Sequence, residues 1–376
     1  MFNFGRENKS LLASWWRNID KTILILIILL FFFGLFFSFS STSSMVGEKL
    51  NKESYFLFLK HFLFVCIALI IIFFISIQRR ETIKNYLPYF FLASFLLLLL
   101  VPFIGVEIKG AKRWINLFFL PRFQPIEILK PFIIVMVALI LSSKNKSNLY
   151  LKYFLSFLLI FPIIILLISQ PDLGQTILIF LTWFALIFVS GINLFLFFAF
   201  FGLMISIILY LIFFVPKFEY ILIRITSFFD PSLGNNYQSE KASEAIINGG
   251  FFGKGIGEGV LKNRVPEAHT DYIVSVISEE FGVIVIILLM IVFLFFIYQV
   301  FKKLYFEKNN KIKLILVGSS SIILFQALIH LGVNIRLFPT TGMTLPFLSY
   351  GGSSTVGTAI VAGLMINLTK KSQKIL

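Results

Sequence analysis

The chain has 376 residues, of which 58% are hydrophobic and 14% are charged, and its formal net charge is +15. Soluble domains are about 45–50% apolar, and here the excess comes in blocks of roughly 20 residues, enough to cross a bilayer core. This composition excludes a soluble globular protein. The basic balance is typical of cytoplasmic membrane-protein loops rather than of a nucleic-acid-binding surface, so no nucleic-acid partner is expected. The single cysteine excludes a disulfide scaffold.

Ten apolar segments predict an all-α polytopic membrane protein with ten transmembrane helices. They cover approximately residues 22–41, 55–77, 85–105, 126–142, 150–169, 174–191, 193–215, 272–300, 314–335 and 345–368. With the N-terminus in the cytoplasm, the cytoplasmic segments carry 18 Lys and Arg residues and the short outer loops carry 7. Cytoplasmic loops carry the excess of these residues in membrane proteins. Both termini are therefore predicted to be cytoplasmic.

Two outer segments are unusual for simple connections between spans. Segment 106–125 mixes apolar and basic residues, which is typical of a stretch that lies in the membrane interface. Segment 216–271 is a long extracytoplasmic loop of 56 residues between spans seven and eight. Because a loop of this length without structure of its own is uncommon, it is predicted to act as a lid or a functional surface.

Charged residues inside apolar segments are costly, so they are the first candidates for function. Glu127 and Lys130 lie three residues apart at the start of span four, where they can form an ion pair on one helix face. A structural ion pair and a lysine facing an anion-binding cavity are both open interpretations. Asp172 and Gln175 form a polar cluster in the turn before span six, where a helix cap is the alternative to a functional role.

Span eight is expected to begin next to an acid at the outer interface and to carry two more acids inside the membrane. Asp271 precedes the span, where lipid-held substrate and water can both reach it, or where it serves only as a helix cap. Glu279 and Glu280 would lie roughly 12–14 Å deeper on one continuous helix. Such buried acids need partners or water, so they are predicted to be structural or to line a cavity.

Two glycine-containing motifs complete the list of polar features. Residues 248–259 (NGGFFGKGIGEG) do not form a nucleotide-binding loop, because glycine follows the lysine where that loop needs Ser or Thr. Residues 342–354 (GMTLPFLSYGGSS) contain Ser349 and Ser353 at the mouth of span ten, where small and hydroxyl residues permit close helix packing or line a cavity. The three histidines show no metal-ligand spacing.

Several of these stretches together resemble one family. KGAKRWINL, QPIEILKP, QPDLGQT, YQSEKASEAIINGGFFGKGIGEG, PEAHTDYIVSVISEEFG and PTTGMTLPFLSYGGSS occur in this order over residues 109–354. They are similar to the SEDS family (shape, elongation, division and sporulation proteins). Thr344, in GMTLPF, favours the division branch, FtsW, over the elongation branch, RodA. The family's fold has ten transmembrane helices, in agreement with the hydropathy pattern.

The resemblance implies a peptidoglycan glycosyltransferase that polymerises lipid II into β-1,4 glycan strands at the outer face of the inner membrane during septal synthesis. The aspartate of HTD, Asp271, is then the general base of an inverting reaction, and His269 beside it is a substrate-binding candidate. Arg113, Trp114, Glu127, Lys130 and Arg264 are the other candidates for binding lipid II, the basic ones through its pyrophosphate.

The resemblance also implies partners and a location. A class B penicillin-binding transpeptidase and other division-machinery membrane proteins are expected partners, at the division septum of a bacterial inner membrane. No cofactor is required, because the lipid pyrophosphate is already activated, although a divalent cation (Mg²⁺ or Mn²⁺) could assist the leaving group.

Two other functions remain as alternatives on the sequence. A lipid II flippase would also use intramembrane charges, and it should depend on midplane residues such as Glu279 more than on an interfacial Asp271. A non-catalytic division scaffold would tolerate replacement of Asp271 by Asn.

Overall fold

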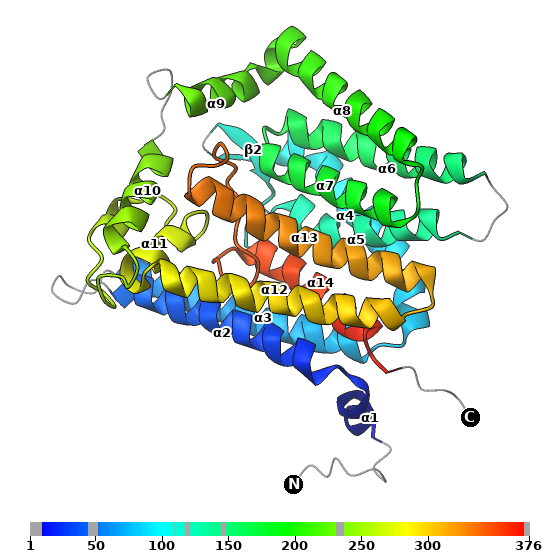
Figure 1. The fold of residues 1–376 in the computed structure, drawn as a ribbon, viewed down its shortest axis with the longest axis horizontal. Helices are drawn as coiled ribbons and strands as arrows, with labels where there is room; N and C mark the ends of the chain where they lie inside the picture. The colour runs from blue at the N-terminus through cyan, green and yellow to red at the C-terminus, as the bar shows by residue number, and fades with distance from the viewer. Residues whose placement is uncertain are drawn as a thin grey trace.

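The computed structural model describes residues 10–43, 52–108, 110–116, 121–143, 148–230 and 237–371. Lys109, residues 117–120 and residues 231–236, which belong to the two outer segments singled out above, lie outside the described residues. Within the described ranges the chain forms fourteen α-helices and one small two-stranded sheet. The long helices lie side by side with their axes close to one direction (Figure 1). The protein is therefore an all-α polytopic membrane protein.

Each predicted span overlaps a long helix. These helices are α2 (Lys21–Ser43), α3 (Lys52–Ile77), α4 (Arg80–Ile104), α5 (Pro125–Leu141), α6 (Leu149–Ser169), α7 (Leu173–Val189), α8 (Leu194–Phe214), α12 (Val283–Phe306), α13 (Asn310–Asn334) and α14 (Gly352–Leu368). Among the described residues, seven helices are long and apolar enough to cross a membrane, and α5, α7 and α14 have 17 residues each. The number of ten crossings and the cytoplasmic termini stay predictions.

Span eight is not the continuous helix that the sequence predicted. Helix α11 (Ile273–Phe281) ends at Gly282, which has φ +81°, and α12 starts at the next residue. A side chain at Gly282 would put its Cβ 2.1 Å from the carbonyl oxygen of Phe251, so only glycine fits this turn. Helix α12 alone is long enough to cross a bilayer. Glu279 and Glu280 lie on α11, just before the first residue of α12, and not within one continuous helix.

Span ten also begins later than predicted. Residues 345–350 form a turn before α14, in which Phe347 has φ +67° and the backbone N–H of Leu345 donates to Oγ of Ser349 at 2.8 Å. The hydropathy of LPFL predicted helix here. The hydroxyl of Ser349 instead satisfies a backbone donor of the turn.

The two unusual outer segments have secondary structure of their own. Strands β1 (Val106–Ile108) and β2 (Ala111–Trp114) form an antiparallel hairpin in segment 106–125, whose position in the membrane interface stays a prediction. The long loop contains the 3₁₀ helices η1 (Pro216–Phe218) and η3 (Leu261–Arg264), and helices α9 (Glu219–Phe229) and α10 (Tyr237–Gly249). Its described part is folded, as its length predicted.

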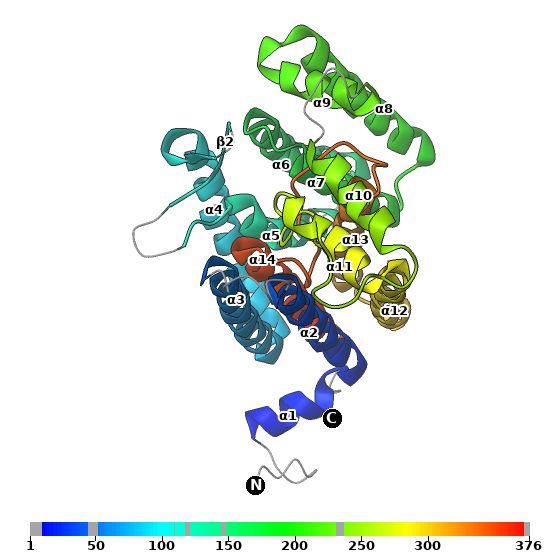
Figure 2. The same ribbon diagram turned by 90° about the vertical axis from the view of Figure 1, so that its left-hand side faces the viewer.

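Small residues allow the central helices to approach closely. An added Cβ at Gly357 of α14 would lie 2.2 Å from the carbonyl oxygen of Glu127 in α5, and one at Gly363 would lie 2.9 Å from Cβ of Ile75 in α3. Helix α14 is buried along its whole length, and Figure 2 shows it between α3 and α5. Close backbone approach through small residues is a common basis of helix association in membranes.

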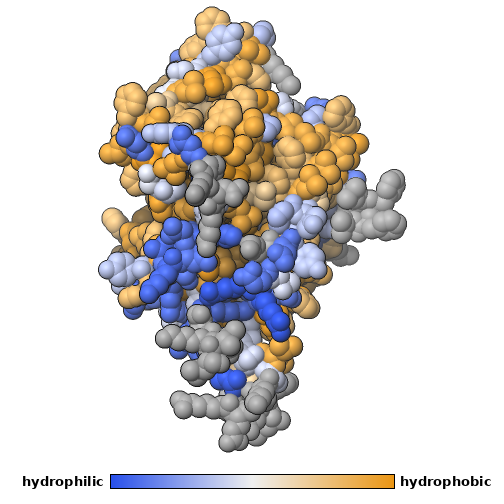
Figure 3. Space-filling view, turned by 90° about the vertical axis from the view of Figure 1, so that its right-hand side faces the viewer, coloured by the Kyte–Doolittle hydropathy of each residue, from blue (hydrophilic) through white to orange (hydrophobic). Residues whose placement is uncertain are grey.

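Helices α8 and α9 lie at one edge of the bundle in both ribbon views (Figures 1 and 2). The short helix α1 (Leu11–Asn18) lies at the opposite edge. Figure 3 shows the end of the molecule that holds the turn between α12 and α13, where hydrophilic residues gather between hydrophobic surfaces. The polar site described next lies at the other end.

Candidate functional site

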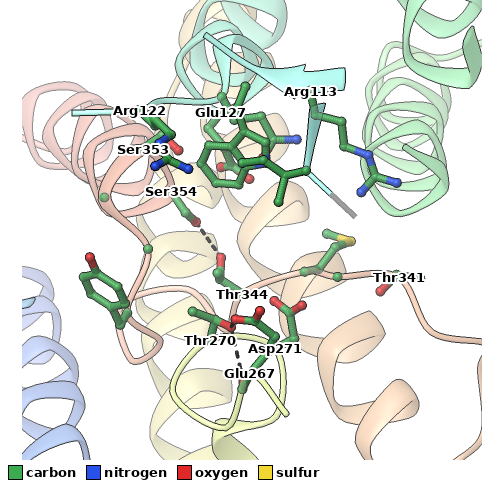
Figure 4. A pocket seen from close by; sticks show the side chains of 18 of the residues that line it. Arg113, Arg122, Glu127, Glu267, Thr270, Asp271, Thr341, Thr344, Ser353 and Ser354 are labelled. Carbon is green, nitrogen blue, oxygen red and sulfur yellow. Dashed lines mark hydrogen bonds between the residues drawn. The ribbon is translucent and has the colours of Figure 1, made fainter. Parts of the chain in front are cut away.

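A cavity of about 920 Å³ opens at the end of the molecule that holds the β-hairpin. Its lining comes from residues far apart in the sequence, contributed by α3, the hairpin, α5, α9, the turn before α11, and the segment before α14. Its charged lining residues are Lys60, Arg113, Arg122, Glu127, Arg224, Glu267 and Asp271. Figure 4 shows Arg113, Arg122 and Glu127 on one side of the space and Asp271 and Glu267 on the other.

Asp271 is held by a tight backbone turn. Glu267 adopts φ +56°, and its carbonyl oxygen accepts the N–H groups of Thr270 and Asp271, each at 3.1 Å. The side-chain amide of Asn334 on α13 donates to the carbonyl oxygen of Asp271 at 3.1 Å. Oδ1 of Asn334 in turn accepts a hydrogen bond from Oγ of Ser275 at 2.9 Å. The backbone that carries the Asp271 carboxylate is therefore fixed on the end of α13, a largely buried helix.

The segment before α14 clamps the same turn from the other side. Ser349 Oγ donates to the carbonyl oxygen of Thr270 at 2.7 Å, and the N–H of Tyr350 donates to the carbonyl oxygen of His269 at 3.0 Å. Gly342, with φ +68°, brings its backbone against the acid, since a Cβ there would lie 3.6 Å from Oδ2 of Asp271. These bonds leave the carboxylate in the cavity and hold its backbone rigidly.

The opposite wall carries Arg113, placed by β2. Its guanidinium donates to the carbonyl oxygens of Gln170, at 3.1 Å, and of Pro171, and Nη1 lies 4.0 Å from Oδ1 of Asp172. Asp172 caps α7 and accepts a hydrogen bond from Gln124 at 2.6 Å. Burial raises the pKa of the Asp172 carboxyl above its usual value, and Arg113 opposes that shift.

A buried chain of polar side chains runs beneath the cavity floor. Gln175 Nε2 donates to Glu127 at 2.5 Å, and Glu127 forms an ion pair with Lys130 at 2.6 Å, as the spacing of three residues predicted. Lys130 donates to Gln326 at 3.1 Å, and Gln326 donates to the carbonyl oxygen of Thr344 at 2.9 Å. Thr344 in turn shares a hydrogen bond of 2.6 Å with Ser354, and both line the cavity. Lys130 does not line the cavity and acts on it through neighbours.

Comparison with known proteins identifies the family. The family model of FtsW, RodA and SpoVE, described as "Cell cycle protein", matches residues 20–374. The chain belongs to this family. The "Probable peptidoglycan glycosyltransferase FtsW" of Caulobacter vibrioides is 32% identical over 372 residues, covering 98% of this chain and 93% of that protein. The protein of the same description from Coxiella burnetii is 32% identical over 379 residues, covering 97% and 99%. The resemblance to the SEDS family, with FtsW as the similar branch, is confirmed.

Solved structures share the fold of this FtsW/RodA/SpoVE-family chain. A chain from the work "Structural coordination of polymerization and crosslinking by a peptidoglycan synthase complex" superposes with a TM-score of 0.75 at 25% identity, covering 93% of this chain and 97% of that one. The Thermus thermophilus rod shape determining protein RodA superposes with a TM-score of 0.67 at 24% identity, covering 94% and 97%. The second likeness concerns the fold alone.

The cavity brings together only some of the predicted site residues of this family member. Arg113, Trp114, Glu127, Asp271 and Ser353 line it. Lys130, Asp172 and Gln175 lie behind its wall, and Ser349 holds the Asp271 turn from outside the lining. Arg264 and His269 do not line the cavity, although His269 contributes its carbonyl oxygen to the clamp described above.

Glu279 and Glu280 hold the glycine-rich loop. The Glu279 carboxylate accepts hydrogen bonds from Asn248 at 3.0 Å and from the N–H of Leu261 at 2.9 Å. The Glu280 carboxylate accepts one from Ser40 at the end of α2. The carbonyl oxygens of both glutamates accept N–H groups of residues 254 and 255. Both acids are therefore hydrogen-bonded to loop and helix-end groups, and their depth in the membrane stays a prediction.

Several polar residues of the site were not singled out from the sequence. Lys60, Arg122 and Arg224 line the cavity, and Gln326 lies beneath it. Arg122 and Arg224 lie in outer segments that carry other basic residues as well. Their convergence depends on contacts between distant parts of the chain. Gln326 had one signal, a polar side chain in an apolar span, which is typical of interhelical hydrogen bonding.

The cavity does not by itself form a complete metal site. In the described part of the chain, no three His, Cys, Asp or Glu side chains gather in a way that could hold a metal ion. Of the lining acids, Glu127 is already paired with Lys130, while Glu267 and Asp271 share one turn. A divalent cation would have to take further oxygen ligands from a bound phosphate group, so no step below depends on one.

Proposed function

We propose that this chain is a peptidoglycan glycosyltransferase that polymerises lipid II into β-1,4 glycan strands at the outer face of the inner membrane during septal synthesis. One observation carries the proposal: a carboxylate on a rigid turn, Asp271, faces arginine side chains across a single cavity. Glycosyl transfer from a pyrophosphate needs this pairing of a proton acceptor with positive charge. Membership of a family whose relatives bear the same activity in their names supports it.

The reaction assigns one role to each wall of the cavity. Asp271 accepts the proton of the acceptor sugar's 4-hydroxyl while that oxygen attacks the anomeric carbon of the donor from the face opposite the pyrophosphate. The new C–O bond forms as the bond from the anomeric carbon to the pyrophosphate oxygen breaks, with inversion. The leaving pyrophosphate keeps the electron pair and its polyprenyl chain. Arg113 and Arg122 stabilise its growing negative charge.

The proposal is tested with Asp271→Asn in purified protein, supplied with lipid II and its transpeptidase partner and scored for glycan polymer. The amide has the size of the acid but cannot accept the proton, so polymer formation should fall at least about 100-fold. The matched control is Glu244→Gln, which removes an exposed acid of α10 that pairs with Lys241 outside the cavity. Normal polymerisation by the Asp271→Asn protein would overturn the general-base role.

A class B penicillin-binding transpeptidase is the partner that we propose, because a structurally similar chain comes from a complex that couples polymerisation to crosslinking. The alternative of a lipid II flippase depended on a midplane role of Glu279. Glu279 instead accepts hydrogen bonds from the glycine-rich loop and from Leu261, so this observation does not favour a flippase. A scaffold remains distinguishable, because it would tolerate the Asp271→Asn change.

A further inference from the structure

Helix α9 of the long loop sends one arginine into the cavity. Arg224 lines the cavity although its helix lies at the edge of the bundle, next to α8 (Figure 2). Its guanidinium lies over the ring of Tyr220 at 5.8 Å and donates a long hydrogen bond of 3.4 Å to the carbonyl oxygen of Thr340. In the part of the chain that the structure describes, it forms no ion pair with a carboxylate. These weak contacts offset little of the free-energy cost of half-burying a charged guanidinium.

The part of the cavity lining that holds Arg113 and Arg224 carries more positive than negative charge. Arg113 is close enough to Arg224 for their like charges to interact, and burial together with Arg113 lowers the pKa of Arg224 below its usual value. Asp172 is an acid that interacts electrostatically with both arginines; it lies 4.0 Å from Arg113 and is already hydrogen-bonded to Gln124. Two arginines thus share one buried carboxylate, an arrangement that a bound anion would stabilise.

From this geometry we infer that Arg224 binds the second phosphate of the donor's pyrophosphate, with Arg113 binding the first. This inference rests on the proposed function and adds a binding residue from the long loop to it. Two guanidinium groups from separate elements, β2 and α9, match a diphosphate better than a monophosphate, because each can donate to a different phosphate group. Arg113 keeps N–H donors beyond those that it gives to the carbonyl oxygens of Gln170 and Pro171. The pair therefore provides selectivity for the diphosphate of the substrate over a lipid monophosphate.

A purely structural role for Arg224, as an anchor of α9, would predict a different result from a role in binding phosphate. The anchor of α9 is Tyr220, whose hydroxyl donates to the carbonyl oxygen of Ile168 at 2.9 Å and whose pKa burial raises to about 12. The bond from Arg224 to Thr340 is longer than an ordinary N–H···O bond. If Arg224 only fixed α9, its loss would resemble the loss of the Tyr220 hydroxyl and would not discriminate between phosphate ligands.

The experiment measures binding without turnover. Geranyl pyrophosphate and geranyl monophosphate are titrated into full-length protein carrying Asp271→Asn, with and without Arg224→Ala. The loss of one charge-assisted contact should weaken pyrophosphate binding roughly 10- to 100-fold and monophosphate binding less than about 3-fold. Arg224→Lys, which keeps the charge but not the fork, should lose an intermediate amount of pyrophosphate affinity and serves if the alanine variant does not fold.

Tyr220→Phe is the matched control, since it removes the anchor of α9 and keeps Arg224. It should leave the preference for pyrophosphate unchanged. Equal weakening of both ligands by Arg224→Ala, or no weakening, would overturn the inference. The two proposals fail separately: absence of glycan from the wild-type protein with its transpeptidase rejects the polymerase, whereas normal glycan with an unchanged ligand preference in Arg224→Ala rejects only the role of Arg224.

Discussion

Helices α13 and α8 are both long and apolar, but they occupy opposite environments. The most apolar 18-residue window of α13 is 72% buried, and that of α8 is 11% buried, although α8 has the higher mean hydropathy, 2.7 against 2.0. In α13 small residues permit close approach, as at Gly318, where a Cβ would lie 2.5 Å from Ile134. In α8 a Cβ added at Gly202 would meet no atom within 4 Å. Hydropathy alone therefore does not decide which membrane helix is buried, whereas residue size and polar pairing do.

The cavity is built from both kinds of helix. The packed region supplies the backbone supports of Asp271 through Asn334, and the buried chain through Gln326. The loosely packed α8 continues through η1 into α9, which supplies Arg224. The proton-accepting wall is thus rigid, and one cationic residue of the facing wall is carried by an element with few supports. Substitutions in the packed region should cost far more stability than those in α8.

The largest loss of stability is expected from Lys130→Met. This change leaves the buried Glu127 carboxylate without its cation, and breaking a buried pair from one side costs about 3–5 kcal/mol. Thermal unfolding of the purified protein in detergent measures the effect. The double variant Glu127→Gln/Lys130→Met removes both charges and should recover most of the loss. Equal destabilisation by the single and double variants would contradict a mutually compensated pair.

A matched pair of glycine substitutions compares the two regions directly. Gly357→Ala should destabilise by about 1–3 kcal/mol, because its Cβ would overlap the carbonyl oxygen of Glu127 at 2.2 Å and force α14 away from α5. Gly202→Ala in α8 meets open space and should be neutral or stabilise by up to about 1 kcal/mol through helix propensity. Unfolding temperatures of the two variants test this contrast, and similar losses in both would show that α8 is packed.

The sequence predicted those features that depend on neighbouring residues. The positions of the long helices follow from hydropathy, and the Glu127–Lys130 pair follows from spacing on one helix face. The cap formed by Asp172 follows from its residue type just before an apolar run. These features need no knowledge of how distant segments meet.

The errors arose where distant contacts override local apolarity. Gly282 breaks span eight because the carbonyl oxygen of Phe251 occupies the place of a side chain, and hydropathy cannot register such an approach. Ser349 keeps its segment out of helix α14 through bonds to Leu345 and to the Asp271 turn. Arg224 enters the cavity from 47 positions before Asp271 in the chain. A single sequence gives the identity of such residues but not their convergence.

The smallest expected effect concerns the end of the bundle away from the cavity, where α2 and α12 are tied by an ion pair of 2.7 Å between Asp20 and Lys303. Burial acts to raise the pKa of Asp20, but hydrogen bonds from Lys303 and from the N–H groups of Ile23 and Thr22 outweigh it, so the folded pKa lies below 3.8. The stabilisation is therefore present above pH 3.8 and is lost as the pH falls through the lower folded value. Because the Lys303 side chain is 38% exposed, the stabilisation by this ion pair should amount to less than about 1 kcal/mol. Between pH 5 and pH 3, the free energy of unfolding should fall less with decreasing pH in Asp20→Asn than in the wild-type protein. Helix α8 carries no charged residue to form such a tie. An identical pH dependence in the wild-type and Asp20→Asn proteins would contradict a contribution of the Asp20–Lys303 pair to stability.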